Sequence, residues 1–553
     1  MSTLDWIVLG LFIVGLAGII VWVLKKKDKD TADYFLAGRD ATWIAIGASI
    51  FASNIGSEHV VGLAGAGAES GMAMAHWEMH GWMILLLGWL FVPFYSRSKV
   101  FTMPEFLERR YNSHARSFLS VISLVSYVLT KVAVTVYAGG VVFKDVFDIS
   151  YITFFGYDID FFWISAIGLV LLTGLYTTFG GMKAVLYTSV LQTPILLVGS
   201  IAILILGLIK LGGWSEMMEI CSANVSIHGD PMTSLIRSPR DAEFPWTGVI
   251  LGSAIIGFWY WCTDQFIVQR VLSGRNMKQS RRGTIFGAYL KLTPVFIFLI
   301  PGMIAYALQQ KGIFYLENND AAFSTMVKEL LPIGFKGIVI GGILAALMSS
   351  LASLFNSSAM LFTVDFYKKY HPNANERHYV IVGRIATVVI VLLGIAWIPV
   401  MRGLGKVLYE YLQDVQSLLA PGIAAVFLLG VLSKKITSAA GLWGLLVGFI
   451  LGMTRLGLNI FSSSIPESSI VYKIFLVHNW LHYEIYLFVL VIVLMIIISY
   501  FTKKKDPDSL AGLTLATTTK EMYKETRSSY NHWDIINSVI IIAAILAFYV
   551  YFW

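Results

Sequence analysis

The stretch that decides the fold is residues 53–71, SNIGSEHVVGLAGAGAESG, which lies between the apolar runs WIAIGASIFA and MILLLGWLFVPF. Its polar side chains include Asn54, Ser57, Glu58, His59 and Glu69, and its glycines are 56, 62, 65, 67 and 71. Within lipid, unwound backbone survives only where it is buried in protein or lines a cavity. The stretch therefore predicts a membrane helix that unwinds near its middle and frees carbonyls at about Ala52–Ile55 for a small cation. A glycine-rich packing face with a few buried hydrogen bonds is the alternative.

Composition places the whole chain in a membrane. Of its 553 residues 57% are hydrophobic and 14% charged, whereas a soluble chain carries about a quarter charged residues. Apolar runs of about 20 residues recur throughout, as membrane-spanning helices require. Two cysteines, Cys221 and Cys262, make no disulfide framework. The phosphate-loop pattern GxxxxGK[ST] is missing from the sequence, which argues against direct drive by ATP.

Fourteen spanning helices are predicted from the apolar runs. They cover about 4–24, 42–70, 73–96, 115–147, 161–180, 184–211, 246–271, 284–310, 321–368, 379–401, 404–432, 438–460, 482–502 and 532–552. Lysines follow the first apolar run and none precedes it, which indicates an anchoring helix that starts outside and not a cleaved signal peptide. The odd-numbered connections, 503–531 among them, then lie inside and hold most of the 41 Lys and Arg residues. This bias predicts that both termini lie outside.

A second polar interruption follows five helices after the first. Residues 255–270, IIGFWYWCTDQFIVQR, place Thr263, Asp264 and Gln265 inside an apolar run. Transporters often consist of inverted repeats, in which a broken helix of one half has a counterpart in the other. The spacing predicts a five-plus-five inverted repeat.

A row of hydroxyl groups lies in residues 345–363, AALMSSLASLFNSSAMLFT. Positions 346, 349, 350, 353 and 357 share one helical face by their spacing. Hydroxyls together with free carbonyls form a hard-oxygen site for a Group 1 or Group 2 cation. The alternative is that these serines hydrogen-bond to their own helix.

Six motifs in order closely resemble the sodium/solute symporter family, nearest to its sodium/glucose cotransporters. They are DYFLAGRD, ASNIGSEHVVGLAGAG, WYWCTDQFIVQR, YLKLTPVFIFLIPGMIAY, SSLASLFNSSAMLFTVDFY and PGIAAVFLLGVL. The resemblance runs from about residue 33 to about 450. It implies an all-α polytopic fold of the leucine-transporter type. The implied parts are an extra helix in 1–30, inverted repeats over 42–211 and 246–432, and three peripheral helices in 433–553 with a cytoplasmic loop at 503–531.

The resemblance also implies a sodium site and a sugar site. The sodium site would use carbonyls at the first helix break and hydroxyls of the serine face. The matching residues are Ala52, Ile55, Ala346, Ser349 and Ser350. The residues that match the sugar site are Asn54, His59, Glu78, Lys291 and Gln413. Carboxylate, ammonium and amide groups suit hydroxyls that both donate and accept. Alternatively, His59 has a structural role and Lys291 belongs to an ion pair that never touches sugar.

The resemblance also implies an inner and an outer gate, and the chain departs from its relatives at three positions. Tyr260 matches an inner gate that stacks on the sugar, with Trp261 beside it. The outer-gate positions are Leu63, Trp77 and Tyr409, where the aromatics could equally be ordinary packing. The chain departs from relatives at Ser189, where an Asp accompanies a second sodium ion, and at Gly257 and Gly81, where polar groups are common. Ser189 makes a second sodium doubtful although Ser353, its possible partner, is retained.

The predicted function is sodium-coupled import of a hexose, glucose or galactose, across the plasma (inner) membrane by alternating access. The implied partners are sodium, a small sugar and the lipid bilayer, with no nucleic acid and no obligatory protein partner. A same-fold symporter for myo-inositol, a carboxylate or an amino acid is the alternative. A sugar sensor or channel without concentrative transport is a further alternative. An enzyme is disfavoured because Glu78, His59 and Asp264 lie on separate helices with no nucleophile beside them.

Overall fold

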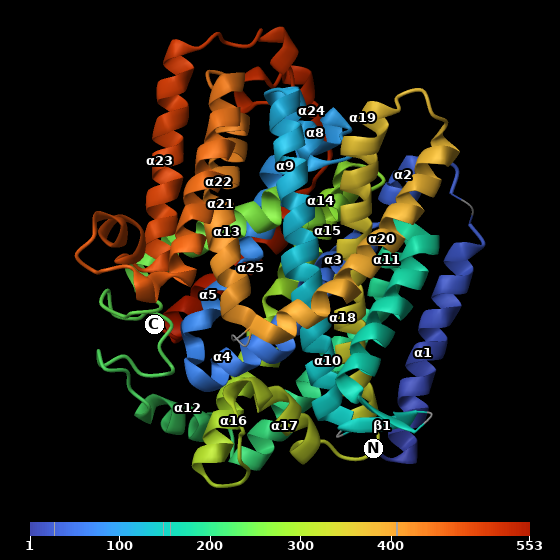
Figure 1. The fold of residues 1–553 in the computed structure, drawn as a ribbon, viewed down its shortest axis with the longest axis vertical. Coiled ribbons are helices and arrows are strands. Elements are labelled where there is room, and N and C mark those ends of the chain that lie inside the picture. Colours follow the sequence, from blue (N-terminus) through green and yellow to red (C-terminus); the bar gives the residue numbers. More distant parts are fainter. Residues whose placement is uncertain (27, 148, 155, 405–407) are drawn as a thin grey trace.

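The protein is a bundle of long helices that run roughly along one direction (Figure 1). The computed structural model describes residues 1–26, 28–147, 149–154, 156–404 and 408–553, and describes only the backbone of residues 154, 400–404 and 408–414. Eleven helices of this described part are long and apolar enough to cross a membrane. They are Thr3–Leu24, Gly71–Ser98, Ser113–Phe147, Phe161–Leu211, Met277–Gln310, Phe335–Tyr370, Glu376–Pro399, Val415–Leu432, Ser438–Ile460, Trp480–Phe501 and His532–Tyr551.

Two of these helices differ from the predicted boundaries. Helix α11 (Phe161–Leu211) contains a break at Gly181, whose φ is 53° and ψ −148°, within the predicted connection between two spans. With 51 residues it is more than twice the length that one crossing needs. The prediction of one helix over 321–368 was wrong. Helix α17 (Ala322–Leu330) is separate from α18 (Phe335–Met360), because Pro332 lacks an amide donor and Gly334 has φ 92°.

The first polar stretch lies at a break between two half-helices. Helix α3 (Trp43–Asn54) ends before Ile55, whose φ of −76° and ψ of 113° are extended. The π-helical turn η2 (Glu58–Leu63) and helix α4 (Ala64–Glu69) follow. Within the described residues, no following amide bonds to the carbonyl of Ala52 or of Ile55. The break leaves both oxygens available to another ligand.

The second polar stretch is built in the same way. Helix α13 (Trp246–Phe258) runs into the π-helical turn η6 (Trp259–Thr263). Asp264 is extended, with φ −73° and ψ 126°, and its side chain caps helix α14 (Gln265–Leu272) by accepting from the amide of Phe266 at 3.2 Å. The break thus starts a new half-helix with its own N-cap.

The chain is not entirely helical. Strands β1 (Tyr151–Phe154) and β2 (Tyr157–Asp160) pair antiparallel as a hairpin, with Tyr151 opposite Asp160. The all-α prediction missed this hairpin, which lies in a connection too short and too exposed to affect the apolar pattern. It sits at one end of the bundle, away from the two breaks (Figure 1).

Glycines let both halves of the first broken helix pack closely against one neighbouring span. That span comprises α15 (Met277–Lys291), the π-helical turn η7 (Val295–Leu299) and α16 (Ile300–Gln310). A Cβ on Gly47 of α3 would lie 2.8 Å from the carbonyl oxygen of Gly283, and a Cβ on Gly67 of α4 only 2.2 Å from that of Leu299. A Cβ on Gly302 would likewise lie 2.0 Å from the carbonyl oxygen of Ala64. We call these contacts the glycine seam.

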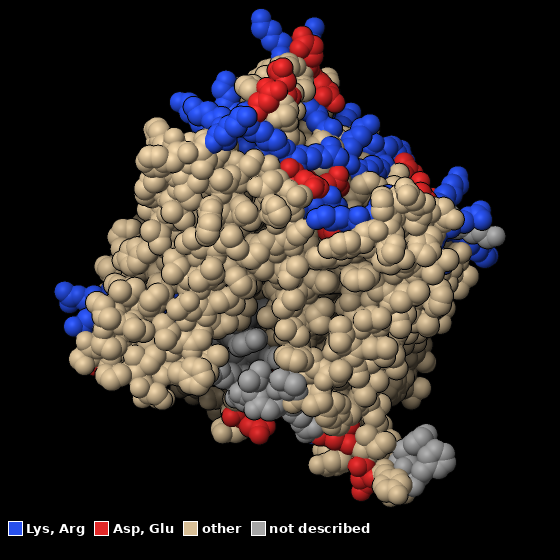
Figure 2. All heavy atoms as spheres, turned by 45° about the horizontal axis from the view of Figure 1, so that its top comes forward, with Lys and Arg blue, Asp and Glu red and all other residues tan. Residues whose placement is uncertain are grey.

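Charge is distributed unequally between the two ends of the bundle. Most Lys and Arg side chains visible in Figure 2 gather above a broad uncharged belt. In Figure 1 this is the end that carries α8 (Met103–Arg110), α19 (Lys368–Tyr370) and α24 (Lys520–Ser528). Both chain termini lie toward the opposite end, and near the C-terminus Tyr551 accepts a hydrogen bond from Trp214 of α12 (Trp214–Ala223) at 2.9 Å.

Candidate functional site

The two breaks face one polar cavity of about 70 Å³. Seven of the predicted site residues line it: Asn54, His59, Trp77, Glu78, Tyr260, Trp261 and Lys291. These residues come from four separate stretches of the sequence, so the cavity exists only in the folded chain. A cavity of this size holds several water molecules, each of which needs roughly 10–15 Å³.

A connected set of buried polar groups forms one wall of the cavity. The Lys291 ammonium donates to Glu78 Oε2 at 2.5 Å and to Asn54 Oδ1 at 3.0 Å. His59 Nε2 lies 3.4 Å from the other carboxylate oxygen of Glu78. All four side chains are buried. An isolated charge in this position would be very unfavourable, and the pairing of Glu78 with Lys291 is what makes both tolerable.

Tyr260 links the two breaks. Its hydroxyl accepts a hydrogen bond of 3.1 Å from Asn54 Nδ2, so the second broken helix contacts the first across the cavity. Trp261 packs edge-on against the Tyr260 ring at 4.9 Å and lies 5.3 Å from the Lys291 ammonium. The site therefore combines aromatic faces with a row of donors and acceptors, which suits a ligand with both apolar and hydroxyl surfaces.

One of the three predicted outer-gate residues, Trp77, lines the cavity. Trp77 stacks on Trp480 at 5.9 Å, whereas Leu63 is buried and is not among the residues that line the cavity. Gln413 and Tyr409 lie outside the residues whose side chains the structure describes. Their predicted roles stay predictions.

The cavity also contains residues that the sequence analysis did not assign to it, chiefly Glu58, His80 and Gln416. His80 occupies the space left by Gly257, since a Cβ there would lie 2.8 Å from its ring. The glycine at 257 was a visible signal, but nothing in the sequence identified its neighbour. Gln416 lies almost one helical turn beyond Gln413 on α21 (Leu408–Leu432).

The predicted sodium residues are all buried. Ser350 lines a smaller cavity of about 20 Å³, and Glu58, Tyr260 and Gln416 line both cavities. Within the described part of the chain the Ser350 hydroxyl has no hydrogen-bond partner. Hydroxyl and carbonyl oxygens are the ligands that hard cations prefer. The residues present at the Ala52–Ile55 break and on α18 fit an alkali cation by this chemistry.

Ser349 and Ser353 of the same helix are bonded to serines of neighbouring helices. Ser53 and Ser353 share a hydrogen bond of 2.7 Å, and Ser189 lies 3.2 Å from the hydroxyl of Ser349. Ser189 also donates to its own helix at Val185 O, 2.7 Å away, and Ser353 donates to Ser349 O at 2.7 Å. The cation interpretation of the serine face therefore fits Ser350, and the alternative, in which serines hydrogen-bond to their own helix, fits Ser353.

A second buried ion pair lies at the Asp264 break. The Lys131 ammonium, on the π-helical turn η5 (Tyr127–Val132), donates to Asp264 Oδ2 at 2.6 Å. Tyr127 donates to the other carboxylate oxygen and accepts from the amide of Phe266 at 3.1 Å. Lys131 lies 4.9 Å from the centre of the Tyr260 ring. The second break is therefore anchored from a different helix than the first.

Comparison with known proteins agrees with this architecture. The family model for the "Sodium:solute symporter family" matches residues 34–448. "Sodium/glucose cotransporter 1" of Sus scrofa is 36% identical over 534 residues, which cover 90% of this chain and 79% of the relative. "Sodium/myo-inositol cotransporter" of Homo sapiens is 36% identical over 493 residues, 82% of this chain and 67% of the relative. A solved structure of a Na⁺-coupled sialic acid symporter aligns with a TM-score of 0.74 at 20% identity, covering 91% of this chain and 99% of that one.

The fold, which is shared with that solved symporter structure, and the candidate membrane helices define a multi-pass membrane protein. The chain belongs to the sodium:solute symporter family. Sodium is the coupling ion of that family, and its substrates are small solutes.

Proposed function

We propose that this protein imports a hexose, glucose or galactose, together with sodium by alternating access. The observation that carries the proposal is the connected wall of Asn54, Lys291, Glu78 and His59 in the cavity between the two breaks. This set offers a carboxylate, an ammonium and an amide to a ligand rich in hydroxyls, and Tyr260 and Trp261 offer aromatic faces to its C–H surface. One relative is named for glucose and another for myo-inositol, and both of these compounds are rich in hydroxyls.

Sodium binds in this proposal between the first break and α18, at the carbonyls of Ala52 and Ile55 and the hydroxyls of Ser349 and Ser350. Ala346 would contribute its carbonyl. The unpartnered hydroxyl of Ser350 supports it. One charge moved across ~100 mV releases ~2.3 kcal/mol, and a tenfold sodium gradient adds about 1.4 kcal/mol. One sodium ion therefore supports an accumulation of roughly a few hundredfold.

Fourteen spans with both termini outside are the proposed topology. The break at Gly181 would divide one of the eleven long helices into two spans. The two broken helices are not among the eleven and would add one span each, which makes fourteen. An even number agrees with the position of both termini toward one end of the bundle (Figure 1), and the Lys and Arg end would then be cytoplasmic (Figure 2). Residues 42–211 and 246–432 would be the inverted repeats, flanked by 1–30 and 433–553.

The test is uptake into proteoliposomes of radiolabelled glucose, galactose, myo-inositol and proline, with sodium or potassium outside. Hexose accumulation that needs sodium, and that Ser350→Ala weakens at a fixed sodium concentration while Ser358→Ala keeps it, is the expected result. Ser358 is a buried serine of the same helix whose hydroxyl also has no partner among the described residues, so it is a matched control. Accumulation of myo-inositol or proline alone would refute the hexose assignment, and uptake that ignores sodium would refute the ion site.

A further inference from the structure

One buried glutamine joins the inner half of the second broken helix to the helix that carries the sodium serines. Gln269 lies on α14 and is completely buried. Its Nε2 donates to Asn356 Oδ1 at 2.6 Å, and its Oε1 accepts from the hydroxyl of Ser357 at 2.7 Å. Nε2 also donates to the carbonyl oxygen of Phe35 at 2.7 Å. Both ends of the carboxamide are therefore used, and two of its three bonds reach α18.

The position of these contacts on α18 relates them to the sodium site. Ser357 follows Ser350 by seven residues, which is nearly two helical turns, so the two serines share a face about 10 Å apart. The sequence marks Ser357 as part of the serine face, yet its partner is Gln269 and not a cation. A displacement of α18 at Ser350 is therefore passed to α14 through side chains only two turns away.

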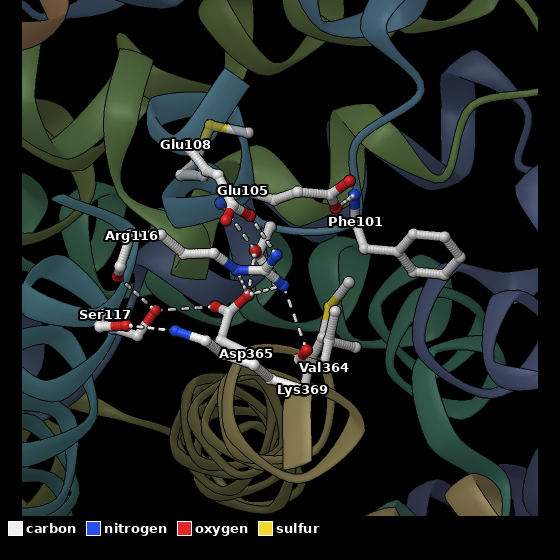
Figure 3. Close-up of polar contacts among 12 residues, drawn as sticks. Phe101, Glu105, Glu108, Arg116, Ser117, Val364, Asp365 and Lys369 are labelled. Carbon is white, nitrogen blue, oxygen red and sulfur yellow. Dashed lines mark hydrogen bonds and ion pairs between the residues drawn. The ribbon is translucent and has the colours of Figure 1, made fainter. Parts of the chain in front are cut away.

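The C-terminal end of α18, which carries Asn356 and Ser357, is anchored just beyond these residues. Beyond it, in the π-helical turn η9 (Leu361–Tyr367), the buried Asp365 accepts from Arg116 Nη2 at 2.7 Å and from the hydroxyls of Thr102 and Ser120 at 2.8 and 2.9 Å. Figure 3 shows Arg116 above Asp365, with Glu108 bonded to the same guanidinium at 2.6 Å. Because Asp365 is held by several charged bonds, a tilt of α18 about this end moves Ser350 most and Ser357, between Ser350 and Asp365, by a smaller amount.

Helix α14 is the short element that such a movement would release. Its N-cap, Asp264, follows Tyr260 of the larger cavity by four residues, and the helix continues for eight residues from Gln265. Its other buried amide, Gln265, accepts from the backbone amide of Met103 at 2.8 Å and donates to Met360 Sδ, at the last residue of α18, at 3.4 Å. Gln269 makes the two shorter polar contacts with α18, and they lie nearer to the sodium serines.

We propose that Gln269 is the positioning residue that couples sodium binding to the inner gate. While sodium is bound at Ser349 and Ser350, α18 keeps Ser357 and Asn356 within hydrogen-bond distance of Gln269. Helix α14 then stays in its closed position next to the cavity. When sodium leaves, α18 shifts, the two bonds lengthen, and α14 with Tyr260 is free to open. This inference rests on the proposed sodium site.

The experiment compares hydrogen exchange of the full-length protein in sodium and in potassium, without sugar. In the wild type we expect sodium to slow exchange of the backbone amides of residues 265–272. Ser357→Ala removes one of the two bonds to α18 and leaves every predicted sodium ligand in place. One neutral hydrogen bond changes an equilibrium by about two- to tenfold, so the sodium-dependent difference should fall by that factor. Ser358→Ala, its neighbour, should behave as the wild type.

The same proteins are then tested for sugar leak from loaded proteoliposomes without sodium. Ser357→Ala should raise the leak by about two- to tenfold and lower accumulation, with sodium-driven initial uptake kept. A purely structural effect would speed exchange equally in both salts and would leave the sodium-dependent difference unchanged. An unchanged difference in Ser357→Ala overturns the coupling role of Gln269. A wild type whose residues 265–272 ignore sodium overturns it too, and sodium-dependent uptake then decides separately whether the proposed function stands.

Discussion

The pairing of Glu78 with Lys291 yields the sharpest prediction about the cavity. Replacing Glu78 by Gln keeps the size of the side chain and its carbonyl acceptor, but removes the charge that faces the Lys291 ammonium at 2.5 Å. The ammonium then remains buried with only the Asn54 amide oxygen, 3.0 Å away, and the new neutral amide as acceptors. We expect two separable losses, one of stability and one of substrate affinity.

The size of each loss follows from the burial of the pair. Removing one partner of a buried ion pair destabilises a protein by about 3–5 kcal/mol, because the other charge is left uncompensated. A hydrogen bond from a sugar hydroxyl to a carboxylate contributes about 1.5–3 kcal/mol. Its loss corresponds to a fall in affinity of about 10- to 150-fold. The double variant Glu78→Gln with Lys291→Met removes both charges, so it should recover much of the stability and none of the affinity.

The assay is thermal unfolding of the purified variants, followed by sugar uptake over a range of concentrations. The control is Glu69→Gln, which alters an exposed carboxylate beyond the first helix break and should change neither the stability nor the affinity for substrate. Wild-type uptake by Glu78→Gln would show that the carboxylate does not bind substrate. Recovery of affinity in the double variant would show that the pair is only structural. Either result would refute the reasoning.

Three further predictions concern single contacts. Ser350→Ala should raise the sodium concentration for half-maximal uptake at least tenfold, because the loss of one charge-assisted contact has about that effect. A sodium titration of uptake measures it, and an unchanged midpoint would contradict the prediction. Gly257→Ala places a Cβ 2.8 Å from the His80 ring, so the ring must move and the preference among glucose, galactose and myo-inositol should change, as competition uptake would show; an identical preference would mean that His80 does not face the ligand. Tyr260→Phe keeps the ring and loses its hydroxyl, so affinity should fall about two- to tenfold while sodium dependence is kept; if dependence disappears instead, the hydroxyl has a gating role.

The apolar pattern predicted most of the fold because lipid imposes it. Spans such as Thr3–Leu24 and Trp480–Phe501 are long apolar runs whose acidic residues, Asp5 and Glu484, lie near the start of each helix, and their ends agree with the prediction to within two residues. The interruptions at Ile55 and Asp264 were also visible, because polar residues are costly within lipid and stand out inside an apolar run. The boundary between α17 and α18 was missed because a break outside the apolar core needs no polar signal and depends on Pro332 and Gly334 alone.

The site was only partly predictable, for a different physical reason. A residue's type shows what it can bind, but its partner depends on contacts between distant segments. Glu58 lies in the first stretch and was visible as a polar residue, yet only the fold places it on both cavities. Gln269 was hidden for the same reason, because its partners Asn356 and Ser357 are nearly ninety residues away, at separations of 87 and 88. The sequence could indicate which charged and polar groups line the cavity, but not which of them bond to one another.

The glycine seam bears on where the transporter bends. Both halves of the first broken helix approach the backbone of residues 277–310 closely, at Gly47 and at Gly67; at Gly47 the ring of Phe286 is also in contact, and at Gly67 the nearest atoms are all backbone. Sliding or tilting of either half by a fraction of an ångström would drive one main chain into the other. We therefore expect Ile55 to be a permanent kink and not a hinge. Paired spin labels on α4 and α16 should keep one fixed separation through the whole transport cycle, while the span itself, Lys291 included, travels with them as a single rigid body.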